Sequence, residues 1–256
     1  MEGPSDQRAY SRAFGIDRRN IFPAAGRINV LGVARVLAER PLSGVTCVVD
    51  RDFDDAASRL SELDFLVFSD NADMDMMLFA SGVLDRVVEA WGTRAKLRQL
   101  GGTVALRTRV SQCVAPLSAL RAANVAERWG VAFSTLKVVD VIDQELLELE
   151  IRRVAAKLAN ALVSPGELEA RSSAQPPTCP STGMPLMSGK DAAAAVDAAL
   201  RKLVGNLSHQ QVKDGVVVRS LRVGVGYGDL AGTPFAERFE SALVSALGQA
   251  TPEGEG

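Results

Sequence analysis

The sequence has few of the residues that build several common kinds of site. It contains one histidine, His209, in a polar stretch, and three widely separated cysteines, Cys47, Cys113 and Cys179. An odd number of scattered cysteines indicates neither a disulfide framework nor a zinc site. A lone histidine argues against histidine-based acid–base catalysis. We therefore expect His209 in an exposed loop.

The sequence also lacks a strong net charge and a long apolar run. Its 256 residues carry a formal net charge of −2, so a contact with nucleic acid would need local basic patches, such as the arginines of residues 8–27 or the basic residues of 94–109. No apolar run is long enough to cross a bilayer, and the acidic start at Glu2 argues against a secretory signal. These features predict a cytoplasmic protein without a membrane partner.

The stretch that stands out is residues 45–55, VTCVVDRDFDD, in which an apolar run ends in acidic side chains. The run is typical of a strand buried on both faces of a parallel sheet. Asp50 and Asp52 would then lie at its carboxyl end, the edge at which open α/β sheets bind ligands. Side chains two apart on an extended segment point the same way, so we expect both carboxylates to reach one cation.

A divalent cation would relieve the repulsion between carboxylates packed so closely. Oxygen ligands suit hard cations, which indicates Mg²⁺ or Mn²⁺. Two plainer interpretations remain open. The run is a solvated acidic loop, or Asp54 and Asp55 cap the start of a helix.

The surrounding pattern predicts an α/β fold, with a doubly wound, mostly parallel sheet over residues 1–91. A turn at residues 24–27 is expected to lead into a helix that turns Ile28, Leu31, Val33, Val36 and Leu37 inward. A strand at 64–69 and a helix at 73–91 continue the alternation. Residues 92–248 are expected to be mainly helical, with helices at 116–129, 143–162 and 191–204, a long loop at 164–188 and a last helix from Pro234. Residues 249–256 are expected to be a disordered tail.

Several segments together resemble the Toprim fold of topoisomerases, primases and OLD-type nucleases. Glu2-Gly3 opens a helix, the residues from Gly26 to Val30 follow, and Asp50-Arg51-Asp52 ends a strand. The longer pattern is similar to a Toprim-like family found beside ATPases in anti-phage loci of the PARIS type. The segments that match it are MEGPSD, AAGRIN, VVDRDFD, SDNADMDMMLF, PLSALRAAN, SGKD and RSLRVGVGYGDLAGTPFAERFE.

The resemblance implies a set of site residues. Glu2 corresponds to the family's catalytic glutamate, and Asp50 and Asp52 correspond to its Asp-x-Asp pair. Asp75 stands where relatives often carry a further acid, and Asp54 belongs to the same acidic run, so both join the expected metal ligands. The sequence departs from the family's pattern at two places. Met1 alone precedes Glu2, which predicts a truncated first strand, and Lys190 stands where relatives often have histidine.

The activity implied is metal-dependent hydrolysis of phosphodiester bonds in DNA, or in RNA such as tRNA, by an anti-phage effector that an ATPase partner controls. Hydrolysis is preferred over strand passage because the nearest tyrosine, Tyr10, lies a helix away from the acids. One alternative is a catalytically decayed ATPase-binding module. The other is a haloacid-dehalogenase-type phosphatase, which Asp54 disfavours because that motif expects threonine or valine there. The oligomeric state stays open.

Overall fold

The computed structural model describes residues 1–248, which form two compact units. The first contains residues 1–51, 55–70 and 225–248, and the second contains residues 52–54 and 71–224. This division differs from the one expected at Trp91. Residues 71–91 group with the second unit because the two helices that they form, α4 and α5, pack against its helices α10 and α12.

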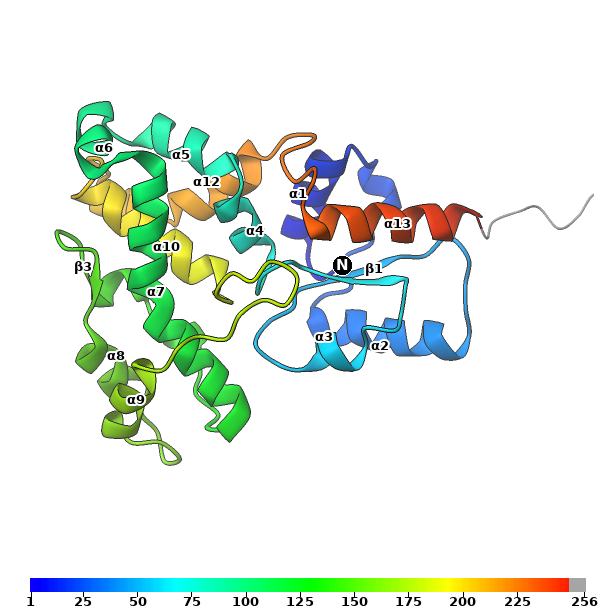
Figure 1. Cartoon of the computed structure of the whole chain (residues 1–256), viewed down its shortest axis with the longest axis horizontal. Helices are drawn as coiled ribbons and strands as arrows, with labels where there is room; N and C mark the ends of the chain where they lie inside the picture. Colours follow the sequence, from blue (N-terminus) through cyan, green and yellow to red (C-terminus); the bar gives the residue numbers. More distant parts are fainter. Residues whose placement is uncertain (249–256) are drawn as a thin grey trace, which may run out of the picture. The chain divides into compact units, whose positions relative to one another are not determined.

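The first unit is built around two parallel strands (Figure 1). Its elements are α1 (Pro4–Phe14), η1 (Arg18–Asn20), α2 (Arg27–Glu39), β1 (Cys47–Val49), α3 (Ala56–Arg59), β2 (Leu66–Phe68) and α13 (Pro234–Gly248). In the ladder, Cys47 lies opposite Leu66 and Val49 lies opposite Phe68. Every residue of both strands is buried, as expected for strands covered on both faces.

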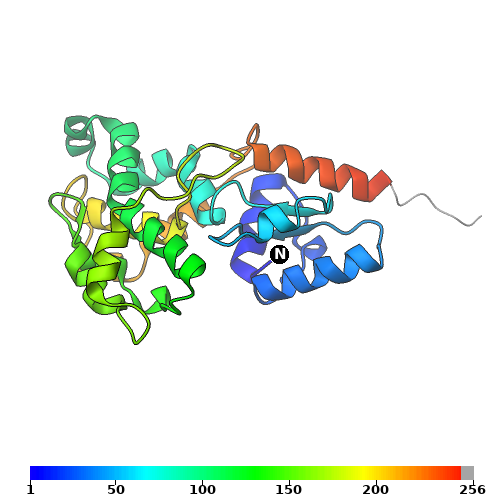
Figure 2. The ribbon, with the colours of Figure 1, turned by 60° about the horizontal axis from the view of Figure 1, so that its bottom comes forward.

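Helices cover both faces of this strand pair, and Figures 1 and 2 show the strands between α2 and α13. On one face, α2 and α3 pack on Cys47, Val49, Leu66 and Phe68. The other helix layer is held by an aromatic cluster of α1 and α13, formed by Tyr10, Phe14, Phe235 and Phe239. The first unit is therefore a three-layer α/β/α arrangement with a very small sheet.

The buried face of α2 differs from the expected one. The helix buries Val30, Ala34 and Leu37, whereas Ile28 is 85% exposed and Val36 is 58% exposed. Apolar residues occur on most sides of this helix, so periodicity alone did not identify the inward face. The small side chain of Ala34, fully buried, lets the helix lie close to the strands.

The second unit is almost entirely helical. Its helices are α4 (Met74–Ala80), α5 (Val83–Trp91), α6 (Arg94–Leu100), α7 (Gly102–Glu127), η2 (Phe133–Thr135), η3 (Val138–Val141), α8 (Ile151–Leu158), α9 (Pro165–Ser172), α10 (Gly189–Arg201), α11 (His209–Lys213) and α12 (Val216–Gly224). Its strands, β3 (Ile142–Asp143) and β4 (Glu148–Leu149), form a short antiparallel hairpin. Helix α10 lies at the centre, in contact with α4, α7, α11 and α12.

Small residues allow α10 to take this central position. Five of its alanines have no exposed surface, and its first residue, Gly189, meets α4 at close range. A Cβ atom on Gly189 would come within 2.3 Å of the Met76 backbone nitrogen and 2.4 Å of an Asp73 carboxylate oxygen. A residue with a side chain would therefore push α10 and α4 apart.

The architecture is mixed α/β with a helical majority, and the extended doubly wound sheet expected for residues 1–91 is not seen in the described chain. There the strands are one parallel pair and one hairpin. The helix expected at 73–91 is divided into α4 and α5, and the one expected at 143–162 is replaced by β3, β4 and α8. The helix expected at 116–129 begins at Gly102 and has Pro116 in its interior.

The long loop expected at 164–188 contains α9. Ser164 caps this helix by accepting a hydrogen bond from the Glu167 backbone, and the Glu167 carboxylate accepts one from the Ser164 backbone. The sequence contains the pattern of this reciprocal capping box, but the surrounding prolines and serines favoured a loop. The tail at 249–256 lies outside the described residues.

Across residues 1–248, none of the helices combines the length and the apolar composition that crossing a bilayer requires.

A buried ion pair joins α7 to α10. Arg121 donates two hydrogen bonds, of 2.7 and 2.8 Å, to the Asp191 carboxylate, and the Asp191 side chain is 4% exposed. The Arg121 guanidinium also lies 4.5 Å above the ring centre of Phe133. This pair should fix the spacing of the two helices.

Replacing Arg121 with methionine leaves the Asp191 carboxylate buried without its cation. We expect the free energy of unfolding, measured by urea denaturation, to fall by about 3 kcal/mol. Arg109→Met, at an exposed position of the same helix, is the matched control and should change it by less than about 0.5 kcal/mol. Equal losses in the two variants would show that the pair does not hold the helices together.

Candidate metal centre

The first residues of the chain are held by backbone hydrogen bonds. The Met1 carbonyl accepts from the Ala24 amide at 2.7 Å, and the Glu2 carbonyl accepts from the Gly26 amide at 2.9 Å. Gly26 has a φ of 123°, a backbone conformation that glycine adopts easily. The segment carrying Glu2 is therefore fixed against the turn that leads into α2.

Glu2 lies at the carboxyl end of β1. Its side-chain oxygen Oε1 accepts a hydrogen bond of 3.0 Å from the backbone N–H of Asp50, the residue that follows the strand. Glu2 and Asp50 are both half-buried. The structure thus brings together two acids that are far apart in the sequence, at the sheet edge where the sequence predicted a site.

Two residues that sequence reasoning missed hold this strand end. The guanidinium of Arg27 donates to the carbonyls of Asp50 at 2.9 Å and Arg51 at 3.1 Å. Ser69, which follows β2, accepts from the Arg51 amide through its hydroxyl at 2.9 Å, and its own amide donates to the Val49 carbonyl at 3.1 Å. An arginine at the start of α2 was the available signal, but only the fold shows that it faces the strand end.

Asp52 does not continue the extended backbone. Its φ is 53°, in the left-handed region, so the argument that Asp50 and Asp52 point the same way is wrong. Asp52 and Asp54 belong to the second compact unit, where the Asp52 amide donates to the Ala72 carbonyl at 2.9 Å. The two aspartates of the motif are therefore assigned to different compact units.

Asp75 is engaged in a different interaction. Its carboxylate, 1% exposed, accepts from Arg222 at 2.5 and 2.8 Å, which links α4 to α12. Both oxygens are turned to the guanidinium, so this acid has the contacts of a structural ion pair. Lys190, at the position where relatives of the resembled family often have histidine, is exposed on α10.

The sequence did not single out Asp73, which has the most unusual environment of the acids around α4. It caps α4 by accepting from the Met76 amide at 2.9 Å, and it accepts from the Gly189 amide at 3.0 and 3.1 Å. Burial first, and then the negative charges of Asp75 and Asp52, raise the pKa of Asp73 to about 7. The signal in the sequence was its position as a helix N-cap.

The types and number of the side chains near the strand end limit which metal ions they could hold. Within residues 1–248, no group of three or more histidine, cysteine, aspartate and glutamate side chains is placed to hold a metal ion. The carboxylates of Glu2 and Asp50 match in type and number the protein ligands with which Mg²⁺ is usually held, since water and substrate phosphate complete its shell. Asp75 does not fit, because Arg222 occupies its carboxylate.

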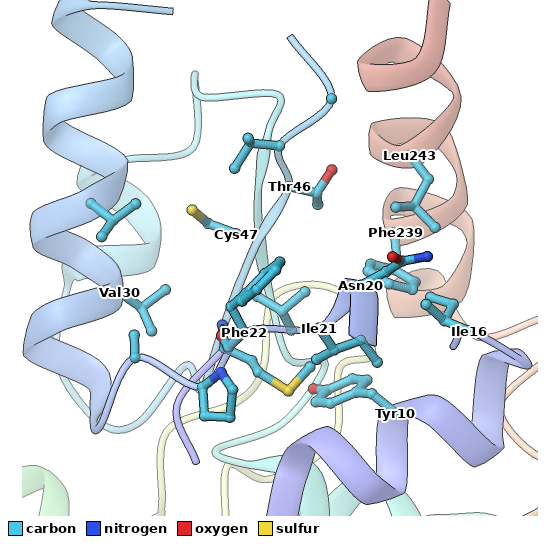
Figure 3. Close-up of a pocket in the computed structure, with 17 residues that line it drawn as sticks. Tyr10, Ile16, Asn20, Ile21, Phe22, Val30, Thr46, Cys47, Phe239 and Leu243 are labelled. Atoms are coloured by element: carbon cyan, nitrogen blue, oxygen red, sulfur yellow. Dashed lines mark hydrogen bonds between the residues drawn. The ribbon is translucent and has the colours of Figure 1, made fainter. Parts of the chain in front are cut away.

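A separate cavity of about 640 Å³ borders β1 in the first unit (Figure 3). Its walls are mostly apolar and include Ile21, Val30, Phe239 and Leu243. The Thr46 hydroxyl oxygen is buried there and has no hydrogen-bond partner among residues 1–248. Among the residues that the structure describes, the lining contains no carboxylate and no histidine side chain.

Comparison of the chain with family models, with curated proteins and with solved structures gives no match.

The raised pKa of Asp73 predicts a pH-dependent stability. The folded-state pKa of about 7 lies above the ordinary value of 3.8, so the folded protein holds this proton more tightly than the unfolded chain. Stability should therefore fall as pH rises from about 4 to about 7, by roughly 4 kcal/mol for this group. Asp197, whose pKa burial also raises to about 7, should add to the same trend.

Asp73→Asn keeps a capping oxygen and removes the titration. Urea denaturation at several pH values should show a weaker fall in stability between pH 4 and 7 than in the wild type. Glu145→Gln, at an exposed position of the same unit, should leave the profile unchanged. An Asp73→Asn profile that matches the wild type would contradict the assignment.

Proposed function

We propose that this chain is a metal-dependent nuclease of the Toprim type that hydrolyses phosphodiester bonds of nucleic acid, DNA or RNA such as tRNA. In this proposal the three-layer first unit is a reduced version of the doubly wound Toprim core. Glu2 and Asp50 carry Mg²⁺ or Mn²⁺. Asp52 and Asp54 stay predicted ligands.

The observation that carries the proposal is the hydrogen bond of 3.0 Å between the Asp50 amide and the Glu2 carboxylate. It joins two acids at the carboxyl end of a buried parallel strand, the edge at which α/β sheets bind ligands. Both acids are half-buried, which leaves part of each residue accessible. Two carboxylate ligands suit a hard divalent cation whose coordination shell also includes oxygens of a substrate phosphate.

Each residue of the strand end has a role in this mechanism. When bound, the divalent ion supplies charge to offset the scissile phosphate and acidity to activate water. Glu2 and Asp50 supply the carboxylate oxygens that hold the ion; in the alternative, Asp50 holds the ion and Glu2 acts instead as the general base. Arg27 and Ser69 keep the strand end in place through backbone carbonyls and amides.

The nuclease is tested with labelled DNA, tRNA and p-nitrophenyl phosphate in Mn²⁺. We expect the wild type to cut nucleic acid, and Glu2→Gln and Asp50→Asn to lower the rate at least about tenfold, since each removes a charged ligand. Asp64→Asn, an exposed acid of the same unit, is the matched control and should cut normally.

The outcomes separate the alternatives. Unchanged cutting by both variants would refute the proposed site. Turnover of p-nitrophenyl phosphate without cutting would favour the phosphatase, and absence of both activities would favour the decayed binding module.

The proposal includes an ATPase partner that regulates the nuclease. Its support in the chain is that several apolar side chains on or beside α2 are exposed, including Phe22 at 78%, Ile28 at 85% and Val36 at 58%. Apolar side chains gathered on a protein surface mark interaction sites more often than scattered ones do. We therefore assign the partner contact to α2.

Co-expression with an ATPase encoded beside this chain should give a complex on size exclusion. The double variant Ile28→Glu/Val36→Glu should elute apart from the ATPase, because each charge would be buried in the contact. Val244→Glu, 70% exposed on α13 of the same unit, is the control and should stay in the complex. Separate elution of the wild type would refute the partner, and co-elution of the double variant would refute the α2 contact.

A further inference from the structure

A basic concavity lies in the second unit, formed by η3, β3, α8, α10 and α11. Its volume is about 380 Å³. Its charged and titratable lining side chains are Asp140, Arg153, Lys157, Arg201, His209 and Lys213. Four cations therefore share this small space with one carboxylate and the histidine of the chain.

The neighbouring acids offset few of these cations. Arg153 donates a hydrogen bond of 2.7 Å to Glu150, in an exposed pair. Among residues 1–248, Lys157, Arg201 and Lys213 have no carboxylate within salt-bridge distance. Even after Asp140 and Glu150 are counted, two positive charges remain, because four cations face two carboxylates.

Helix dipoles are one reason for basic residues at these places. Lys157, Arg201 and Lys213 each lie in the last turn of their helix, α8, α10 and α11, where a cation complements the negative end of the dipole. That effect acts on each helix separately. It does not require the cations of three helices to meet around one concavity, where they repel one another.

We propose that this concavity binds the phosphate groups of a nucleic-acid strand. Several converging cations with few partners are the arrangement that phosphate oxygens stabilise, and Arg153 and Arg201 present planar donors that suit a phosphate. The choice of nucleic acid as the source of the phosphate rests on the proposed nuclease function. The site would position the strand and take no part in the cleavage chemistry.

The test is fluorescence anisotropy with a fluorescein-labelled single-stranded RNA of 16 nucleotides, recorded in EDTA. Lys157→Ala/Lys213→Ala should weaken binding about tenfold and reduce the slope of log K against log salt concentration by about 1.4, since each lost phosphate contact contributes about 0.7 on a single strand. Both lysines are exposed, so the double variant should fold normally.

The matched control is Arg152→Ala/Lys202→Ala, which removes the same charge from exposed positions beside the concavity that do not line it. It should bind the RNA nearly as the wild type does. If both double variants bind equally well, the concavity does not bind the strand. Calorimetry with inorganic phosphate is the second arm, and phosphate binding as tight as that of the RNA would overturn the assignment to a nucleic acid.

The RNA-binding measurement does not depend on a metal ion at the acidic strand end, because EDTA keeps divalent ions from Glu2 and Asp50. RNA binding that depends on Lys157 and Lys213, in a protein that does not cut, would support this site and refute only the nuclease. Metal-dependent cutting with RNA binding that ignores both lysines would refute only this site.

Discussion

The hydrogen bond from the Asp50 amide to the Glu2 carboxylate is the interaction on which the candidate site depends. Asp50 is placed by β1, which is buried between α2 and the opposite helix layer, and Glu2 is placed by backbone bonds to Ala24 and Gly26. Neither acid alone would form a site. The bond orients the Glu2 carboxylate toward the strand end.

Three buried acids, Asp70, Asp75 and Asp191, show by contrast what a structural carboxylate looks like in this chain. Asp70 accepts from Arg238 and from the Phe235 amide, and so holds α13 to the end of β2. Asp75 and Asp191 accept two hydrogen bonds each from an arginine. Burying a carboxylate is costly unless it is paired and hydrogen-bonded, and these three meet that condition. Their arginines come from helices far away in the sequence.

Local patterns predicted part of this structure well. The apolar run before Asp50 correctly indicated a buried parallel strand, and the helix start after Glu2-Gly3 and the one at Pro234 were also predicted correctly. The inward face of α2 could not be read from its sequence, because apolar residues surround the helix and the choice among them is made by packing on the strands. The extent of the sheet was overestimated, since strand-like runs were counted without knowing their partners.

The site was only partly predictable for a similar reason. The sequence placed Asp50 at a strand end, but the left-handed backbone of Asp52 and the arginine partner of Asp75 arise from tertiary contacts that no local pattern contains. The same holds for Asp73, whose raised pKa comes from burial beneath α10 and from neighbouring acids. Residue type predicted the carboxylates, and only the fold distinguished those that pair with arginine.

The most direct test of the account is the binding of Mn²⁺, measured by electron paramagnetic resonance as the loss of the free-ion signal. The account predicts that the wild type binds Mn²⁺ and that Glu2→Gln and Asp50→Asn each weaken binding about tenfold or more. Asp64→Asn should bind as the wild type does. Mn²⁺ binding that is unchanged in both Glu2→Gln and Asp50→Asn would contradict the proposed metal site.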